Sequence, residues 1–489
     1  MRTHTPRVST PRAVALLSLA LVLLTTQASG QTDDVARSLD EYLSARTEAG
    51  RFSGAVLVAR GDRVIFRQGY GFADVERRVP YTPETRHQIA SITKMFTSMA
   101  ALKLRDRGHL RLEDSICKYL KDCPAIWEPV TVHHLMRHNS GIPDYEEKLE
   151  LGSDKYMQFM ARRKVVATIY EDAKRQPLDF RPGEKFKYSN TGYIVLGYVI
   201  AAAARRPFAE VLTETVLRPA GLTRTGVLGR GATPKDIANG YTFGDIGWEK
   251  TLAGYPLTSG HLKARARVYG RELSEEERAA LTPAAGDGSL YGTLDDLLRW
   301  SRIMDGGKFV PAAEAAEVFA PGLDGYGYGW ISDTSFERKR LRHTGSLPGY
   351  TSQLIKFPEE KVTIIIFSNL DRARMGAIVR DVTAIVFGKP YDLPVRGRLT
   401  KLTAEQTAAL VGDYKTADGT LLTIRNEPDY LTAQIKDQYT AGLIPLSPTE
   451  FYFPLADGRA VFTLDAAGKA AHVNMRYSGA DHVAERVAP

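Results

Sequence analysis

The chain has 489 residues, of which 43% are hydrophobic and 25% are charged, and its formal net charge is +8. This length exceeds one typical domain, and the composition is that of a soluble globular protein, which excludes the disordered and fibrous classes. The positive charge is spread thinly, without a basic stripe interleaved with aromatic residues, so the sequence argues against a nucleic-acid partner.

The N-terminus has the pattern of a secretory signal peptide. Three arginines precede the apolar run AVALLSLALVLL, and the small residues Ala28 and Gly30 flank Ser29. This pattern predicts a signal peptide over residues 1–30, and therefore an exported protein in the periplasm or outside the cell. The apolar run is too short to span a bilayer comfortably and no cysteine lies at the cleavage point, so we expect no stable membrane anchor after cleavage.

The next segments predict an α+β domain over residues 33–388. DDVARSLDEYLSAR has the periodicity of an amphipathic helix, and GAVLVARGDRVIFRQGYGFAD alternates around a Gly-Asp turn as a β-hairpin does. Helical patterns then dominate from Ser91 to about Trp300, and strand patterns return in RLRHTGSL and SQLIKFPEEKVTIIIFSNL. An antiparallel sheet assembled from both ends, flanked by helices and carrying a helical lobe, fits this order.

A second, smaller domain is predicted at the C-terminus. Residues 389–401 contain two prolines and little periodicity, which is typical of a linker. Residues 402–489 consist of short alternating runs such as LLTIRN, AVFTL and HVNMRY, separated by turn signals. Such runs predict an up-and-down β-barrel or a small sandwich.

The two cysteines, Cys117 and Cys123, lie close together in CKYLKDC. In an exported protein they form either a local disulfide or two separate thiols, and the sequence leaves both alternatives open.

A serine stands three residues before a lysine twice in the chain, and this spacing is short enough to occur by chance. Ser91 and Lys94 run into an apolar stretch with helical periodicity, whereas Ser115 and Lys118 follow the charged residues RLED. At the start of a buried helix the amine can reach the hydroxyl, and the helix N-terminus favours negative charge on the serine oxygen. The alternative for Ser91 is an ordinary N-cap followed by a solvated lysine.

Two further motifs distinguish these interpretations. Tyr188-Ser189-Asn190 is the only Tyr-x-Asn sequence and precedes another apolar helical run. His343-Thr344-Gly345 lies at a predicted strand end and is the only sequence with Lys or His two residues before Gly. Each motif alone is weak, but the order Ser-x-x-Lys, Tyr-x-Asn, His-x-Gly is much less frequent by chance.

With these three motifs the chain resembles the serine β-lactamase and penicillin-binding-protein superfamily, in the branch of class C β-lactamases, D-alanyl-D-alanine carboxypeptidases and related esterases. The resemblance extends from about Val35 to Phe387 and includes LMRHNSGIPDY and GSLYGTLDDLLRW. The C-terminal part resembles a lipocalin-like β domain. The resemblance implies an exported serine hydrolase that acts through an acyl-serine, without a metal or a cofactor, on a small-molecule, peptide or peptidoglycan-derived substrate.

The resemblance also implies a role for each site residue. Ser91 is the nucleophile, and either a neutral Lys94 or a Tyr188 phenolate is the base that activates it. Tyr188 carries protons to the leaving group and from the hydrolytic water. Asn190 orients Lys94 and the substrate. The substrate-binding strand contributes His343, Thr344, Gly345 and Ser346, and backbone N–H groups of Ser91 and Ser346 form the oxyanion hole.

The chain departs from the class C pattern at His343, where those β-lactamases carry a lysine. An unperturbed histidine has a pKa of about 6.5, so we expect it to hold a substrate carboxylate only at lower pH. The departure favours carboxypeptidase-like or esterase-like activity over efficient β-lactam hydrolysis. The alternative function is a non-catalytic peptidoglycan or β-lactam binding protein that keeps the pocket.

His134 and His138 are spaced as metal ligands are, but without the HExxH sequence they are expected to pack or to form local hydrogen bonds.

Overall fold

The computed structural model describes residues 33–48, 51–148, 165–228, 234, 236–243, 262–264, 286–370, 374–393, 402–427, 430–435, 440–453, 458–477 and 480–487. The predicted signal peptide and residues 394–401 of the predicted linker lie outside the described residues.

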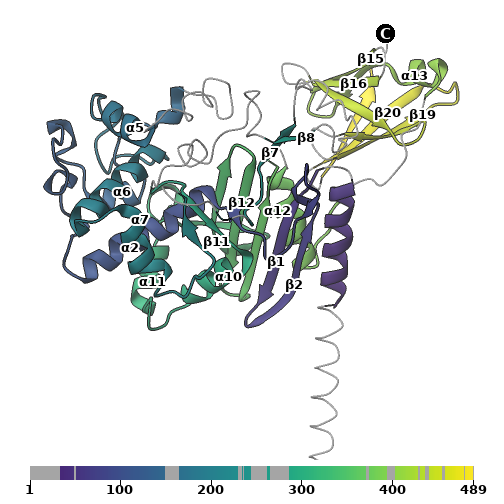
Figure 1. Ribbon diagram of the computed structural model, residues 1–489. Helices are drawn as coiled ribbons and strands as arrows, with labels where there is room; N and C mark the ends of the chain where they lie inside the picture. The colour runs from purple at the N-terminus through teal and green to yellow at the C-terminus, as the bar shows by residue number, and fades with distance from the viewer. Residues whose placement is uncertain are drawn as a thin grey trace, which may run out of the picture.

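A six-stranded antiparallel sheet forms the centre of the larger domain (Figure 1). Its strands, in spatial order, are β10 (Ile331–Ser335), β11 (Arg338–Leu347), β12 (Tyr350–Phe357), β13 (Val362–Ser368), β1 (Gly54–Arg60) and β2 (Arg63–Tyr70). Gly54 of β1 therefore lies opposite Tyr70 on one side and Ser368 on the other. The predicted assembly of one sheet from both ends of the domain is confirmed.

Both faces of this sheet are buried, because successive side chains of a strand point to opposite faces. Ala55 and Leu57 of β1 pack into the core shared with the helical lobe. Val56 and Val58 pack on the other face, against the helix over residues 33–48 and against α12 (Met375–Val386). The near-continuous apolar composition of β1 follows from this burial on two sides.

The helical lobe lies beside the sheet and is centred on α2 (Thr93–Asp106) and α6 (Asn190–Ala204) (Figure 1). Both helices are buried on most of their surface. The other helices of the domain are α3 (Val132–Met136), α5 (Val165–Ala173), α7 (Phe208–Leu212), the π-helix η5 (Thr213–Leu217), α10 (Leu294–Ile303) and α11 (Ala312–Phe319). Short 3-10 turns occur at η1 (Ala90–Ile92), η2 (Ile116–Lys118), η3 (Ala125–Trp127), η4 (Tyr145–Lys148) and η8 (Leu323–Gly325).

Among its described residues the larger domain also contains three small sheets. They are formed by β3 (Phe72–Asp74) with β4 (Val79–Pro80), by β5 (His87–Gln88), β9 (Leu290–Gly292) and β6 (Gly226–Val227), and by β7 (Tyr241–Phe243) with β8 (Leu262–Ala264). Strand β5 lies directly before η1 in the chain. Its pairing with β9 therefore helps to place the start of α2.

The C-terminal domain is a closed antiparallel barrel of eight strands, because the last strand pairs with the first. Its strands are β14 (Gly412–Thr416), β15 (Leu421–Glu427), β16 (Tyr430–Ile435), β17 (Thr440–Pro445), β18 (Glu450–Phe453), β19 (Gly458–Leu464), β20 (Ala470–Tyr477) and β21 (Ala480–Arg486), preceded by α13 (Ala404–Leu410). Leu422, Phe451 and Phe462 belong to its apolar core. Of the two predicted alternatives, the barrel is therefore correct. Between the domains, the Arg51 guanidinium lies 4.7 Å from the centre of the Tyr452 ring.

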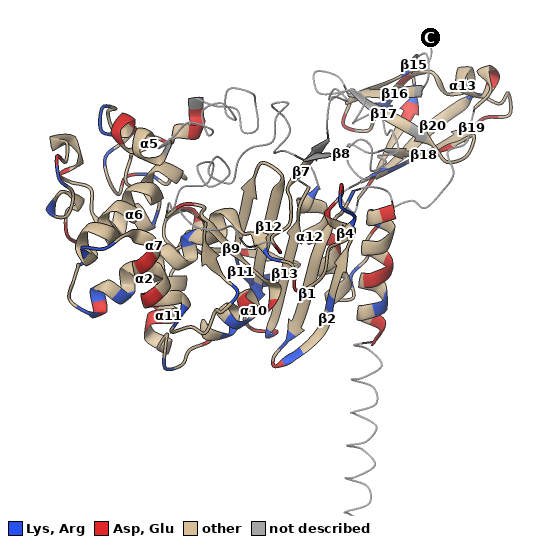
Figure 2. Cartoon of the chain, viewed as in Figure 1, with Lys and Arg blue, Asp and Glu red and all other residues tan. Residues whose placement is uncertain are grey.

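Acidic and basic residues are interspersed over both domains, as Figure 2 shows for the helix over residues 33–48 and for the lobe. Within the described part of the chain, none of the helices combines the length and the apolar composition that crossing a bilayer requires.

Candidate active site

Ser91 lies in η1, immediately before α2, and Lys94 lies in the first turn of that helix. Ala90, directly before the serine, has a φ of 49°, a left-handed conformation that is uncommon for alanine and is often found at functional sites. The Ser91 side chain does not cap α2, and Lys94 is 0% exposed. The alternative of a serine N-cap followed by a solvated lysine is therefore wrong.

The Lys94 amine is surrounded by three oxygen atoms. Its Nζ lies 3.0 Å from Ser91 Oγ, 2.8 Å from Asn190 Oδ1 and 2.8 Å from the Asp287 carbonyl oxygen. The amide and carbonyl oxygens can only accept hydrogen bonds. A neutral amine satisfies both with its two hydrogens and leaves its lone pair for the Ser91 hydroxyl. An ammonium donates to all three, so the same geometry holds the lysine before and after it takes a proton.

Burial lowers the pKa of Lys94 to about 8. The carboxylates of Asp287, Asp144 and Glu146 act in the opposite direction and keep the pKa from falling further. Lys94 is therefore a base that titrates close to neutral pH, which is the range in which a general base is most effective.

Tyr188 faces Lys94 and Ser91 from the segment that leads into α6. The centre of its ring lies 4.9 Å from Lys94 Nζ, and the Ser91 side chain is close enough to influence the pKa of its hydroxyl. Burial raises the pKa of Tyr188 well above its usual range, although the interaction with Ser91 lowers it. Tyr188 is therefore a neutral phenol at neutral pH, and the Lys94 amine is the stronger candidate for the base.

Asn190 is the first residue of α6, and its orientation is fixed by Asp144, which the sequence analysis missed. Asp144 Oδ2 accepts hydrogen bonds from the Asn190 backbone N–H (2.8 Å) and from Asn190 Nδ2 (3.2 Å). The side-chain oxygen of Asn190 then points at Lys94. Asp144 lies within the stretch LMRHNSGIPDY, which carries part of the family resemblance, but the sequence gives no sign of its contact with Asn190.

His343 is buried and both of its ring nitrogens are engaged. Nδ1 lies 2.7 Å from the Thr344 carbonyl oxygen, so it carries the hydrogen, and Nε2 accepts from the Tyr326 hydroxyl at 2.9 Å. Burial lowers the pKa of His343 to about 3, and the positive charge of Lys94 acts in the same direction. The expectation of a histidine that titrates near pH 6.5 and then binds a carboxylate is therefore wrong.

The strand β11 places Thr344, Gly345 and Ser346 beside η1. A Cβ atom on Gly345 would lie 2.2 Å from the Ile89 carbonyl oxygen, which is far too close. A glycine is thus required for β11 to approach the segment that holds Ser91, and Ser346 follows directly at an exposed position.

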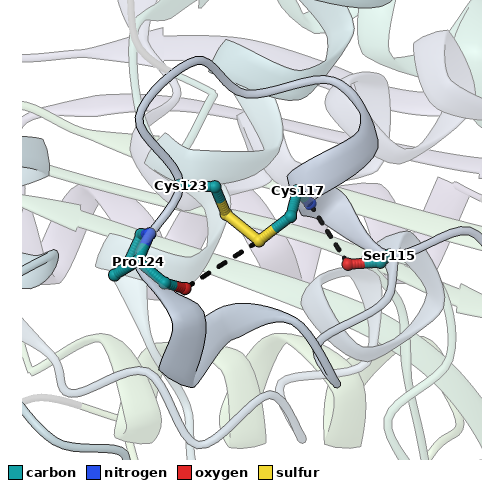
Figure 3. The surroundings of a disulfide bond; sticks show 4 residues. All are labelled: Ser115, Cys117, Cys123 and Pro124. Atoms are coloured by element: carbon teal, nitrogen blue, oxygen red, sulfur yellow. Dashed lines mark hydrogen bonds between the residues drawn. A yellow bond between two sulfur atoms is a disulfide. The ribbon is translucent and has the colours of Figure 1, made fainter.

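The second Ser-x-x-Lys sequence has a different environment (Figure 3). Ser115 Oγ accepts a hydrogen bond from the Cys117 backbone N–H and caps η2. Lys118 is bound to Asp114 at 2.7 Å on the surface. Cys117 and Cys123 are joined in a disulfide that closes the adjacent loop.

The two histidines with metal-like spacing do not act as a pair. His134 Nδ1 accepts from the Thr131 backbone N–H and completes a capping box at the start of α3. His138 lies apart from it, against Tyr188.

Comparisons with known proteins agree with this fold. A family model described as beta-lactamase matches residues 35–386. The chain is 29% identical over 436 residues to penicillin-binding protein 4* of Bacillus subtilis (strain 168), covering 86% of this chain and 92% of that protein. It is 28% identical over 407 residues to a D-aminopeptidase of Gluconobacter oxydans (strain 621H), covering 80% of this chain and 69% of that protein.

Two solved structures share the fold. The octameric penicillin-binding protein homologue from Pyrococcus abyssi has a TM-score of 0.59 at 24% identity and covers 90% of this chain and 97% of its own. The D-amino acid amidase from Ochrobactrum anthropi SV3 has a TM-score of 0.59 at 20% identity, with 73% and 99% of the two chains covered.

Proposed function

Because the chain belongs to the beta-lactamase family of serine hydrolases, we propose that it hydrolyses an amide, peptide or ester bond through an acyl-enzyme on Ser91. The observation that carries this proposal is the position of the buried Lys94 amine, 3.0 Å from Ser91 Oγ. An amine that is partly neutral at pH 7 to 8 supplies the base that a serine hydroxyl needs to become a nucleophile.

In the first half of the reaction, Lys94 takes the Ser91 proton while Ser91 Oγ bonds to the substrate carbonyl carbon. Tyr188 gives its proton to the leaving amine and recovers one from the Lys94 ammonium, and the bond to the leaving group breaks. In the second half, water attacks the acyl carbon, its proton returns through the same two groups, and Ser91 leaves as a hydroxyl. Asn190 holds Lys94 in place throughout, and Asp144 holds Asn190.

Negative charge develops on the substrate carbonyl oxygen during the reaction. We assign its stabilisation to the backbone N–H groups of Ser91 and Ser346. Gly345 supports this assignment, because only glycine allows β11 to pass so close to η1. Donors fixed in this way before the reaction stabilise the oxyanion without reorganisation.

The charges near Ser91 favour substrates that lack a carboxylate at the His343 wall. His343 is a neutral imidazole whose nitrogens are both engaged, so it offers no Coulomb attraction. Relatives are named D-aminopeptidase and D-amino acid amidase. We therefore rank D-amino-acid amides and short peptides with a free amine first, neutral esters second, and carboxylate-ended D-alanyl peptides and β-lactams last.

The test combines covalent labelling with turnover. The full chain is treated with a fluorophosphonate or a fluorescent penicillin, and the adduct is mapped by peptide mass. Release of product is then measured for D-alanine p-nitroanilide, a p-nitrophenyl ester and a D-alanyl-D-alanine peptide. Label on Ser91 with turnover supports the proposal. Label without turnover of any of the three substrates supports the alternative of a binding protein.

Export remains a separate proposal, which rests on the signal-peptide pattern and is consistent with the disulfide between Cys117 and Cys123. Expression with residues 1–30 intact, followed by N-terminal sequencing of protein from outside the cytoplasm, tests it. We expect a mature chain that begins at Gln31.

A further inference from the structure

His138 packs closely against the ring of Tyr188, the proposed proton carrier. Its ring centre lies 4.2 Å from that of Tyr188, with 32° between the planes. A separation below about 4.5 Å is at the short end for aromatic pairs, so the imidazole restricts movement of the phenol perpendicular to its plane.

His138 also binds the backbone on both sides of Tyr188. The Lys187 N–H donates to the His138 carbonyl oxygen at 2.9 Å. The Ser189 N–H donates to His138 Nδ1 at 3.0 Å. One residue thus holds Tyr188 at its ring and at both neighbouring peptide groups.

His138 is itself rigidly placed. It is 2% exposed, and its φ of 55° is a left-handed conformation that most side chains avoid. The rings of Tyr193 and Tyr326 lie 4.8 and 4.6 Å from it on its other sides. Since Nδ1 accepts a hydrogen bond, the neutral ring carries its hydrogen on Nε2. Burial lowers the pKa of His138 well below its usual range, so this tautomer persists at neutral pH.

We propose that His138 is a positioning residue that keeps the Tyr188 hydroxyl aligned with Ser91 and the leaving group. This inference rests on the proposed role of Tyr188 as the proton carrier. Histidine combines the two features that this role uses, an aromatic ring and an acceptor for the Ser189 N–H. Phenylalanine would supply the ring without the acceptor for Ser189, and asparagine would supply an acceptor without the ring.

The central variant is His138→Asn, because asparagine tolerates a positive φ and keeps an acceptor near the Ser189 N–H. Its readout is the ratio of kcat/KM values for D-alanine p-nitroanilide and the p-nitrophenyl ester. An anilide leaves only after it receives a proton, whereas nitrophenolate leaves without one. We expect a loss of about 10²-fold for the anilide, as for a misplacement of about 1 Å, and a clearly smaller loss for the ester.

Tyr188→Phe and the double variant His138→Asn/Tyr188→Phe complete a mutant cycle. If His138 acts through Tyr188, the second substitution adds little once Tyr188 has lost its hydroxyl. His138→Gly offers a further check, since glycine accepts the backbone conformation and leaves room for free imidazole, which should restore part of the anilide activity. Thermal unfolding of every variant shows that the comparison is made between folded proteins.

His133→Asn is the matched control. His133 Nδ1 contacts the Tyr328 hydroxyl at 2.9 Å in the same lobe, but it does not belong to the proposed site. We expect its anilide-to-ester ratio to equal that of the unmodified protein.

Two results would overturn the inference. Equal losses of anilide and ester activity in His138→Asn, or additive losses in the double variant, would mean that His138 does not act through Tyr188. Failure of the proposed function is seen separately, because Tyr188→Phe would then retain full anilide activity or Ser91 would not be labelled.

Discussion

Ser91 with Lys94 and Ser115 with Lys118 share the same spacing in the sequence, but their surroundings in the fold differ in every respect that matters for catalysis. Lys94 is fully buried among two acceptor oxygens and a hydroxyl, whereas the Lys118 side chain is 59% exposed and bound to Asp114. The Ser115 hydroxyl is used to cap a helix. Spacing brings a hydroxyl and an amine within reach of each other, but burial lowers the pKa of the amine to about 8 and the fixed acceptors hold it beside the hydroxyl.

The largest expected effect separates the two serines. Ser91→Ala should lower kcat/KM for an amide by at least about 10³-fold, the scale on which removal of a serine nucleophile acts. Ser115→Ala should keep full activity and lose about 1 kcal/mol of stability, because it removes only a helix cap. Rates and urea unfolding of both variants test this, and an adduct on the peptide that contains Ser115 would contradict it.

The pH dependence sharpens the difference between the lysines. Because the pKa of Lys94 is lowered to about 8, the neutral base is the minor form below that pH and its fraction falls about tenfold per pH unit. We expect kcat/KM for a neutral amide to rise by about 50-fold from pH 6 to pH 8 and to level off above about pH 9. Lys118→Met should leave this profile unchanged. A profile that is flat over this range would exclude neutral Lys94 as the base.

A smaller effect is expected when the support of the Lys94 site is weakened. In Asp144→Asn one carboxylate oxygen becomes an NH2 group, which cannot accept, so either both bonds from Asn190 to Oδ2 or the bond from the Glu146 N–H to Oδ1 is lost. We expect kcat/KM to fall on the order of tenfold while Ser91 can still be labelled. Asp179→Asn is the control, because its carboxylate binds Lys187 near the surface. Equal activity of the two variants would show that Asp144 does not support the site.

The smallest effect on rate is expected from the disulfide beside Ser115. The double variant Cys117→Ser/Cys123→Ser should lose at most about 2–3 kcal/mol of stability, since the loop between the cysteines is short. The kcat/KM of the folded protein should not change. A thiol titration of denatured, unreduced protein checks the starting point, and two free thiols would rule out the disulfide.

The sequence predicts the outline of the fold and the members of the central group, because these depend on side-chain patterns. The apolar alternation of β1 and the late strands specifies a sheet built from both ends. The three motifs supply Ser91, Lys94, Tyr188 and Asn190, which the fold brings together.

The remaining features depend on partners that leave no local pattern. The Asp287 group that binds Lys94 is a backbone carbonyl, which every residue possesses. The neutral state of His343 depends on burial that forms only in the folded chain and on the charge of Lys94, which lies on a distant segment. Sequence reasoning assigned His343 its solution pKa for this reason.

The pairing of β1 with β13 also determines when catalytic activity can arise during synthesis. Gly54 pairs with Ser368, and η1 with Ser91 is held against β11, so the proposed nucleophile lacks its neighbours until almost the whole larger domain has been made. Contacts between such distant parts of a chain form slowly, because a long loop must close first. The hydrolase acquires its activity only after the last strand of the sheet has joined the first.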